Sequence, residues 1–215
     1  MTDDLGFVHR ILPSADAASR DTLLTLHGTG GDENDLISLG QTIAPGAAIL
    51  SPRGNVLENG APRFFKRLAE GVFDPQEVRS RAEELAGFVQ AAIARYALDP
   101  ERIFVLGYSN GANAASTIMF IRPRLIKGAI LLRPMLVYEP EESADLSGSS
   151  VFISAGRMDP IVPAQSVERL AELFQSARAK VTLKWQMVGH NLVPSEVSEA
   201  SAWLALQRST VSASL

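Results

Sequence analysis

The stretch FVLGYSNGANAA, Phe104 to Ala115, decides the fold because one residue pattern changes abruptly into another within it. An apolar β-type run leads into a serine flanked by glycines, and a run of small residues follows. Gly107, Ser109 and Gly111 form the pattern G-x-S-x-G. Between a strand and a helix, this spacing places the serine in a tight, strained turn, where the missing glycine side chains let backbone segments approach closely. The pattern therefore predicts Ser109 as a nucleophile presented above a sheet.

Two other interpretations of the same stretch have to be weighed. Ser109 could be the N-cap of the following helix, but an N-cap does not require glycine on either side. A dinucleotide-binding turn is disfavoured because GYSNGA lacks the G-x-G start of that fingerprint.

Apolar runs and helical patterns alternate along the rest of the chain. Pro75–Tyr96, Ala112–Phe120, Ala164–Ala179 and Pro194–Gln207 have the apolar spacing of helices, and the runs between them are apolar at successive positions. Strand followed by helix, repeated, predicts the α/β class with a doubly wound, mainly parallel sheet and helices on both faces. The opening FVHRIL, residues 7–12, is expected to be an antiparallel edge strand.

Composition limits the function classes. The chain has 215 residues, a net charge of −4 and no cysteine, which argues against a basic nucleic-acid face, a disulfide framework and a thiolate metal site. We expect one domain over residues 1–215, with a core at about 20–207 and a flexible tail at 208–215. The acidic N-terminus does not resemble a signal peptide, and no apolar run approaches the roughly 20 residues that cross a bilayer. These features predict a cytoplasmic protein.

A serine nucleophile needs a base and a group that orients the base. Among the three histidines, His190 follows the last strand-like run, so we expect it to be the general base. Asp159 follows the run SSVFISAG and lies between Ser109 and His190 in the chain order of this sheet type. The alternatives are a loop histidine and an Asx-turn aspartate. Asp145 and Glu139 to Glu142 also fit the order, but they lie in a polar segment typical of a solvated loop.

An acyl-transfer site also needs donors for the oxyanion. The N–H after the nucleophile belongs to Asn110, and the glycine-rich loop LHGTGGDEND offers the N–H of Thr29. Such a loop could also cradle phosphate, although it lacks the lysine of a Walker motif.

The segments LHGTGGDENDL, GYSNGANAA, GRMDPIVP and GHNLVPSEVSEASAWL together resemble the signature regions of the bacterial phospholipase/carboxylesterase family of α/β-hydrolases, relatives of the acyl-protein thioesterases. The resemblance spans about residues 20–207. It implies an α/β-hydrolase fold without a large lid, a Ser109–Asp159–His190 triad, Thr29 and Asn110 as oxyanion donors, and a homodimer. Thioesterases of this group typically carry Gln where this chain has Asn110, which puts thioesterase activity on lipidated proteins in doubt.

A second segment, Ser51 to Asp74, resembles a branch of the family associated with bacterial handling of aromatic and quinone-like compounds. We expect Phe64 and Phe65 to line a substrate pocket and Arg63 to attract an acidic group. The alternative is that the two phenylalanines fill the core and the basic residues face water.

These features predict a serine carboxylesterase that acts on short- to medium-chain or aromatic esters through an acyl-enzyme. It would need no metal and no organic cofactor, and its partner would be a small-molecule ester. The alternatives are a thioesterase or lysophospholipase-type hydrolase, and a hydrolase-like protein that binds a ligand without turnover.

Overall fold

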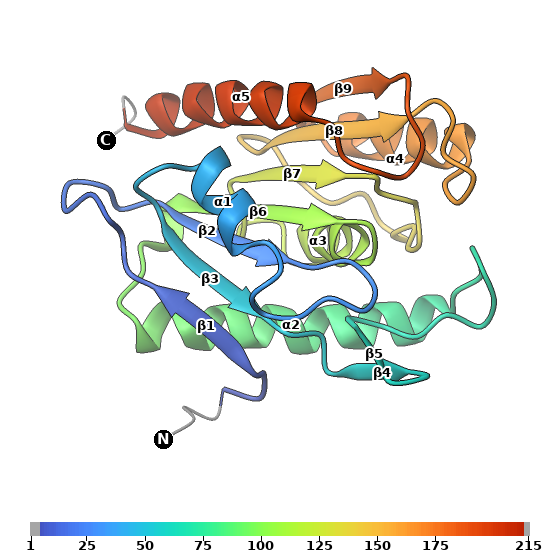
Figure 1. Ribbon diagram of the computed structural model, residues 1–215, viewed down its shortest axis with the longest axis horizontal. Helices are drawn as coiled ribbons and strands as arrows, with labels where there is room; N and C mark the ends of the chain where they lie inside the picture. Colours follow the sequence, from blue (N-terminus) through green and yellow to red (C-terminus); the bar gives the residue numbers. More distant parts are fainter. Residues whose placement is uncertain (1–4, 213–215) are drawn as a thin grey trace.

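The computed structural model describes residues 5–212, and the side chains of residues 5–209. Its centre is a seven-stranded sheet in the order β1-β3-β2-β6-β7-β8-β9 (Figure 1). The strands are β1 (His9–Leu12), β2 (Thr22–Leu26), β3 (Ala48–Pro52), β6 (Ile103–Tyr108), β7 (Gly128–Leu132), β8 (Ser150–Gly156) and β9 (Lys180–Gln186). All neighbours pair in parallel except β1, which runs antiparallel to β3 at one edge. The mainly parallel sheet and its antiparallel edge strand are confirmed.

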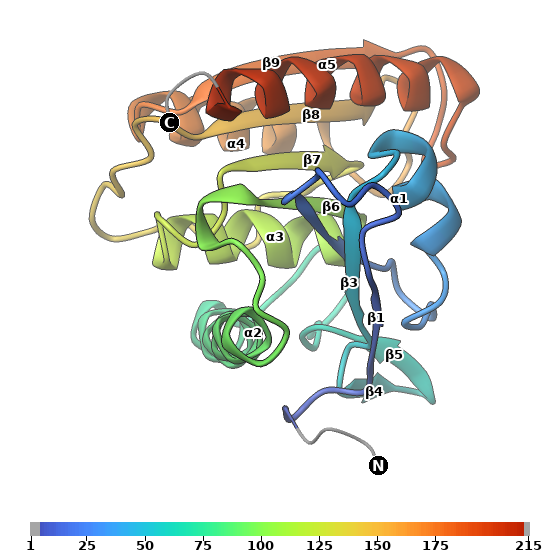
Figure 2. The same ribbon diagram turned by 90° about the vertical axis from the view of Figure 1, so that its left-hand side faces the viewer.

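Helices cover both faces of this sheet, which explains why the strands β2, β7 and β8 are buried at every position (Figure 2). One core cluster joins α2 (Pro75–Arg95), α3 (Asn110–Ile121) and α4 (Ala164–Ser176) to one face. The other cluster joins α1 (Ile37–Ile43) and α5 (Pro194–Ser212) to the opposite face. The chain therefore has the three-layer arrangement that the repeated strand-helix pattern predicts.

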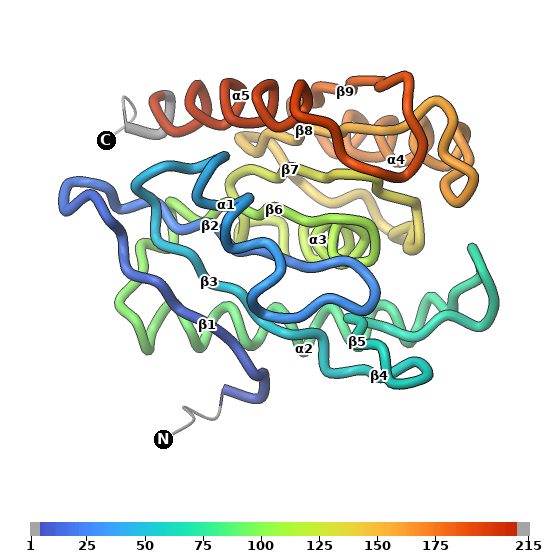
Figure 3. Tube along the Cα trace, in the orientation of Figure 1, coloured from blue at the N-terminus to red at the C-terminus, as the bar shows by residue number. Residues whose placement is uncertain are grey.

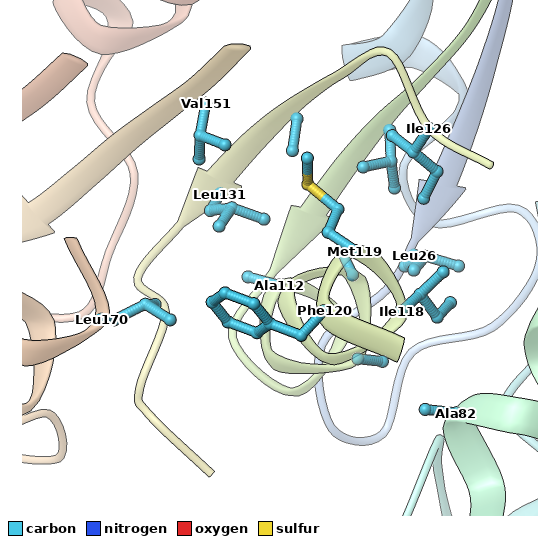
Figure 4. Packing of buried hydrophobic residues seen from close by; sticks show 14 of the residues in the cluster. Leu26, Ala82, Ala112, Ile118, Met119, Phe120, Ile126, Leu131, Val151 and Leu170 are labelled. Atoms are coloured by element: carbon cyan, nitrogen blue, oxygen red, sulfur yellow. The ribbon is translucent and has the colours of Figure 1, made fainter. Parts of the chain in front are cut away.

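Helix α3 is buried from Asn110 to Phe120. Ile118 and Met119 of this helix pack close to Leu26 and Leu131 of the sheet (Figure 4). Its first turns carry mainly small residues, so the helix axis comes close to β2 and β6. This close packing fixes the turn between β6 and α3 against the sheet.

Three local features differ from the sequence-based expectation. The short helix α1 and the hairpin of β4 (Val56–Glu58) and β5 (Ala61–Arg63) were not predicted. Helix α5 continues to Ser212, so residues 208–212 of the expected tail are helical. Arg208 explains part of the difference, because its Nε donates to Asp21 at 2.5 Å and ties the helix end to the sheet. Residues 213–215 of the expected tail lie outside the described residues.

The loops after β2, β6, β8 and β9 gather at the carboxyl edge of the parallel strands, as the tube in Figure 3 shows. The hairpin β4–β5 and the loop that leads to α2 lie at the same edge. In doubly wound sheets, this edge is where ligands bind. Among the described residues, no helix is long and apolar enough to cross a membrane.

Candidate active site

Ser109 occupies the turn between β6 and α3 with φ of 51° and ψ of −115°, a conformation that non-glycine residues rarely adopt. The flanking glycines are required by backbone approach. A Cβ on Gly107 would lie 2.6 Å from Ala112 Cα, and a Cβ on Gly111 would lie 2.0 Å from the Leu26 carbonyl oxygen. Ser109 occupies the N-cap position of α3, but its side chain makes no capping hydrogen bond, so the hydroxyl is not used to cap the helix.

The structure brings Ser109, His190 and Asp159 together from three different loops. Ser109 Oγ lies 2.9 Å from His190 Nε2, and His190 Nδ1 lies 2.7 Å from Asp159 Oδ2. The distances fit a nucleophile–base–carboxylate relay, in which Nδ1–H donates to the carboxylate and Nε2 accepts from the serine hydroxyl. The Asp159 side chain is 1% exposed and that of His190 is 18% exposed, so the relay reaches solvent at the histidine end.

Asp159 combines the two interpretations that its position suggested. Its Oδ1 accepts from the backbone N–H of Ile161 at 2.9 Å and of Val162 at 3.2 Å, which is an Asx-type turn. Its other oxygen, Oδ2, is left for His190. The turn therefore fixes the carboxylate that faces the histidine.

Thr29 and Asn110 lie beside Ser109 in the same cavity. Within residues 5–212, neither backbone N–H donates to another protein group, whereas the next N–H along, that of Gly30, is bonded to the Pro62 carbonyl. Two free N–H groups next to a serine hydroxyl can stabilise an oxyanion. The Asn110 side chain is also used: its Oδ1 accepts from Phe64 N–H at 2.8 Å, while its Nδ2 is buried with no partner among the described residues.

His27 supports the glycine-rich loop that carries Thr29, called the oxyanion loop below. It takes no part in the contacts between Ser109, His190 and Asp159. Its Nδ1 donates to the Gly28 carbonyl at 2.7 Å, and its Nε2 accepts from Gly54 N–H at 2.9 Å. An Nε2 that accepts a hydrogen bond requires the neutral ring, with its proton on Nδ1. Burial lowers the pKa of His27 below its usual value, against a weaker opposing effect of the Gly28 carbonyl, so the neutral form is favoured.

The expectation that Phe64 and Phe65 line the substrate pocket is corrected. They are 3% and 1% exposed and belong to the core cluster under α2. Phe64 packs against the His27 ring and Phe65 against Phe73, because the segment after β5 turns inward and buries both rings. It is Phe73 that lines the cavity.

Arg63 lines the cavity, but most of its donors serve the protein itself. It is 4% exposed, and it donates to Thr29 Oγ1 at 2.6 Å and to the Phe65 carbonyl at 3.1 Å. Glu58 lies 3.4 Å from its Nε. Arg63 therefore anchors the oxyanion loop to β5. Arg67 also lines the cavity and is 38% exposed, which leaves it more accessible to a ligand.

The cavity above Ser109 has a volume of about 240 Å³ and mixes polar and apolar walls. Met135, Ile161 and Val162 supply apolar surface, and Tyr108 lies beside His190 with ring centroids 5.5 Å apart. Tyr108, Arg133 and Glu196 were not singled out from the sequence. The one signal was an arginine directly after the buried run of β7, where a charged side chain is out of place.

Comparisons with known proteins agree with this geometry. The phospholipase/carboxylesterase family model matches residues 9–207. The protein "Putative hydrolase MhqD" of Bacillus subtilis (strain 168) is 44% identical over 185 residues, which cover 86% of this chain and 92% of the relative. The Bacillus cereus carboxylesterase structure is 43% identical with a TM-score of 0.89, covering 92% of this chain and 93% of that chain. A carboxylesterase structure from Mesorhizobium loti is 32% identical with a TM-score of 0.88, covering 94% and 96%. The chain belongs to the phospholipase/carboxylesterase family of α/β-hydrolases.

Proposed function

We propose that this protein is a serine carboxylesterase in which Ser109, His190 and Asp159 perform acyl transfer. Membership of the family makes the protein a hydrolase of the carboxylesterase type. The observation that carries the assignment of residues is the continuous contact from Ser109 Oγ to His190 Nε2, 2.9 Å, and from His190 Nδ1 to Asp159 Oδ2, 2.7 Å.

The proposed mechanism has two half-reactions. Ser109 Oγ attacks the ester carbonyl while His190 Nε2 takes the hydroxyl proton, and Asp159 stabilises the imidazolium that forms. The Thr29 and Asn110 N–H groups hold the oxyanion of the tetrahedral intermediate. His190 then protonates the leaving alcohol, and in the second half-reaction it activates the water that releases the acid.

The cavity supports small ester substrates. Its volume of about 240 Å³ lies below the roughly 300–1,000 Å³ of sites that enclose drug-sized ligands. We therefore propose short- to medium-chain or aromatic esters as substrates. In a series of p-nitrophenyl esters from acetate to palmitate, kcat/KM should be highest at the short end. Equal or higher values for the long chains would contradict this proposal.

Fluorophosphonate labelling tests the nucleophile. The reagent should add covalent mass at Ser109 in the wild-type protein and in Ser147→Ala, a control at an exposed serine in a turn. Ser109→Ala should neither be labelled nor hydrolyse p-nitrophenyl acetate. Retained esterase activity in Ser109→Ala would exclude Ser109 as the nucleophile.

Arg67 offers a test of charge preference. It lines the cavity and is 38% exposed, so an anionic group on the substrate can approach its guanidinium. Arg67→Gln should raise KM for an anionic ester, such as p-nitrophenyl hemisuccinate, more than for the neutral acetate. An equal change in both values would assign Arg67 to its ion pair with Glu58 alone.

A cytoplasmic location and a homodimer stay predictions. Cell fractionation and size-exclusion chromatography with light scattering measure them directly.

A further inference from the structure

An ion pair between Arg133 and Glu196 lies fully buried beside the loop between β9 and α5 that carries His190, called the histidine loop below. Arg133 follows β7, and Glu196 lies in the first turn of α5. Their side chains are both 0% exposed and meet in a two-pronged contact, with Nη1–Oε2 at 2.7 Å and Nη2–Oε1 at 2.9 Å. Removing two charges from water usually costs about as much free energy as their mutual attraction returns. A contribution to stability therefore does not by itself explain this ion pair.

Two of the three remaining donors of Arg133 go to the backbone on either side of His190, and the third, on Nη1, donates to the Ser154 carbonyl at 3.3 Å. Its Nε donates to the Gly189 carbonyl at 3.1 Å, and its Nη2 donates to the Asn191 carbonyl at 2.5 Å. The carbonyl between them, that of His190 itself, accepts from the Tyr108 hydroxyl at 3.1 Å. Three successive carbonyls of the histidine loop are therefore held by two side chains.

Glu196 fixes the same loop from its other end. Its Oε1 accepts from Val193 N–H at 2.6 Å, and its Oε2 accepts from Ser154 Oγ at 2.5 Å. Ser154 lies on β8, the strand that leads to Asp159. The carboxylate thus connects the histidine loop to the strand that carries the third member of the relay.

The Arg133 backbone adopts a left-handed conformation, with φ of 55°. For a residue with a side chain, this conformation is strained, because the Cβ comes too close to the backbone carbonyl. The conformation is held by the bond from Arg133 N–H to the Ser154 carbonyl at 2.8 Å, and the preceding carbonyl, that of Leu132, accepts from Ser109 N–H at 2.9 Å. Strained non-glycine residues gather at functional sites, where surrounding contacts hold them in place. Here, the same turn contacts both the nucleophile and the histidine loop.

We propose that Arg133 is a positioning residue for His190, with Glu196 as its buried counter-ion and Tyr108 as its partner on the His190 carbonyl. The inference rests on the proposed function, because it assigns Arg133 to holding Nε2 in reach of Ser109 Oγ. A displacement of about 1 Å can lower a rate roughly 100-fold. His190 serves both half-reactions, so its displacement lowers kcat while substrate binding changes little.

Arg133→Lys is the direct test. Lysine keeps a positive charge for Glu196, but a single ammonium cannot reproduce the planar fork that reaches Gly189, Asn191 and Glu196 together. We expect kcat for p-nitrophenyl acetate and the fluorophosphonate labelling rate to fall by about 10- to 100-fold, with KM changed by less than about threefold. The low-field proton resonance of the His190–Asp159 hydrogen bond should weaken or broaden.

Arg102→Lys is the matched control. Arg102 is also a buried arginine, and it pairs with Asp21 at 2.7 Å at the opposite edge of the sheet. This control should lower the melting temperature and leave kcat unchanged. If Arg133→Lys lowered the melting temperature but kept wild-type kcat and the low-field resonance, the positioning role would be refuted.

Tyr108→Phe keeps the proposal testable if Arg133→Lys does not fold. It removes only the bond to the His190 carbonyl and should lower kcat by a few-fold, because one neutral hydrogen bond to the loop is lost. Unchanged kcat in Tyr108→Phe would contradict the proposal. Failure of the proposed function is distinct, since it would appear as retained activity in Ser109→Ala.

Discussion

Gly111→Ala tests whether the close approach of α3 to β2 sets up the active site. The added Cβ would lie 2.0 Å from the Leu26 carbonyl oxygen and 2.6 Å from that of His27. Ordinary contact begins at 3.4 Å, so the two backbones must separate by about 1.4 Å. Neither obstacle is a flexible side chain that could rotate away.

This separation should cost both stability and rate. Overpacking typically costs about 1–3 kcal/mol, and a backbone obstacle places this variant near the upper end. Ser109 and the Asn110 N–H move with α3, while Thr29 follows β2 and stays with the sheet. A shift of about 1 Å between nucleophile and oxyanion donor should lower kcat/KM roughly 100-fold.

Urea denaturation and p-nitrophenyl acetate hydrolysis measure the two effects. Gly87→Ala is the matched control, because Gly87 is exposed in α2 and a Cβ there meets no atom within 4 Å. The control should gain about 0.5–1 kcal/mol of stability, since alanine is the better helix former, and should keep full activity. Gly111→Ala with stability within about 0.5 kcal/mol of wild type and unchanged kcat/KM would refute the reasoning.

Three further changes separate stability from catalysis. The folded state lowers the pKa of His27, so below about pH 6.5 the unfolded chain binds a proton that the folded chain does not, and stability falls as pH falls. His27→Gln should therefore flatten the plot of unfolding free energy against pH between about pH 8 and 5.5. Parallel plots for the variant and the wild type would contradict this. Asp21→Ala removes the carboxylate that accepts from Arg102 and should cost about 3 kcal/mol while the labelling rate of Ser109 stays unchanged. Gly156→Ala would place a Cβ 2.3 Å from the Gly189 carbonyl, so it should slow labelling by displacing the histidine loop; a wild-type rate would argue against that displacement.

The residues of the candidate site could be predicted from the sequence where the local backbone geometry of a short segment requires particular residue types. G-x-S-x-G needs glycine on both sides because the backbone of β2 and of α3 itself comes within contact distance. Asp159 and His190 could be placed because strands of a parallel sheet end at one edge, so the loops after β8 and β9 must meet there. The order of these segments along the chain was therefore enough to predict that Ser109, His190 and Asp159 lie close together.

The side chains of the segment after β5 could not be oriented in this way. The stretch is irregular, without helical or strand periodicity, so the sequence left the direction of Phe64 and Phe65 open. Packing against His27 and Phe73 decides it, and both rings turn into the core. In the core, the two rings bury more apolar surface than they would in the wall of an open cavity.

The sequence by itself determined the class of the fold, the strained serine turn and the order of the relay residues, because each depends on periodicity or on local backbone geometry. The tertiary structure alone decided how the histidine loop is held. Arg133 and Glu196 are 63 positions apart, and their pairing depends on β7 and α5 meeting at one end of the sheet. Local spacing cannot encode such a contact, since it arises only when the two elements pack and exclude water between them.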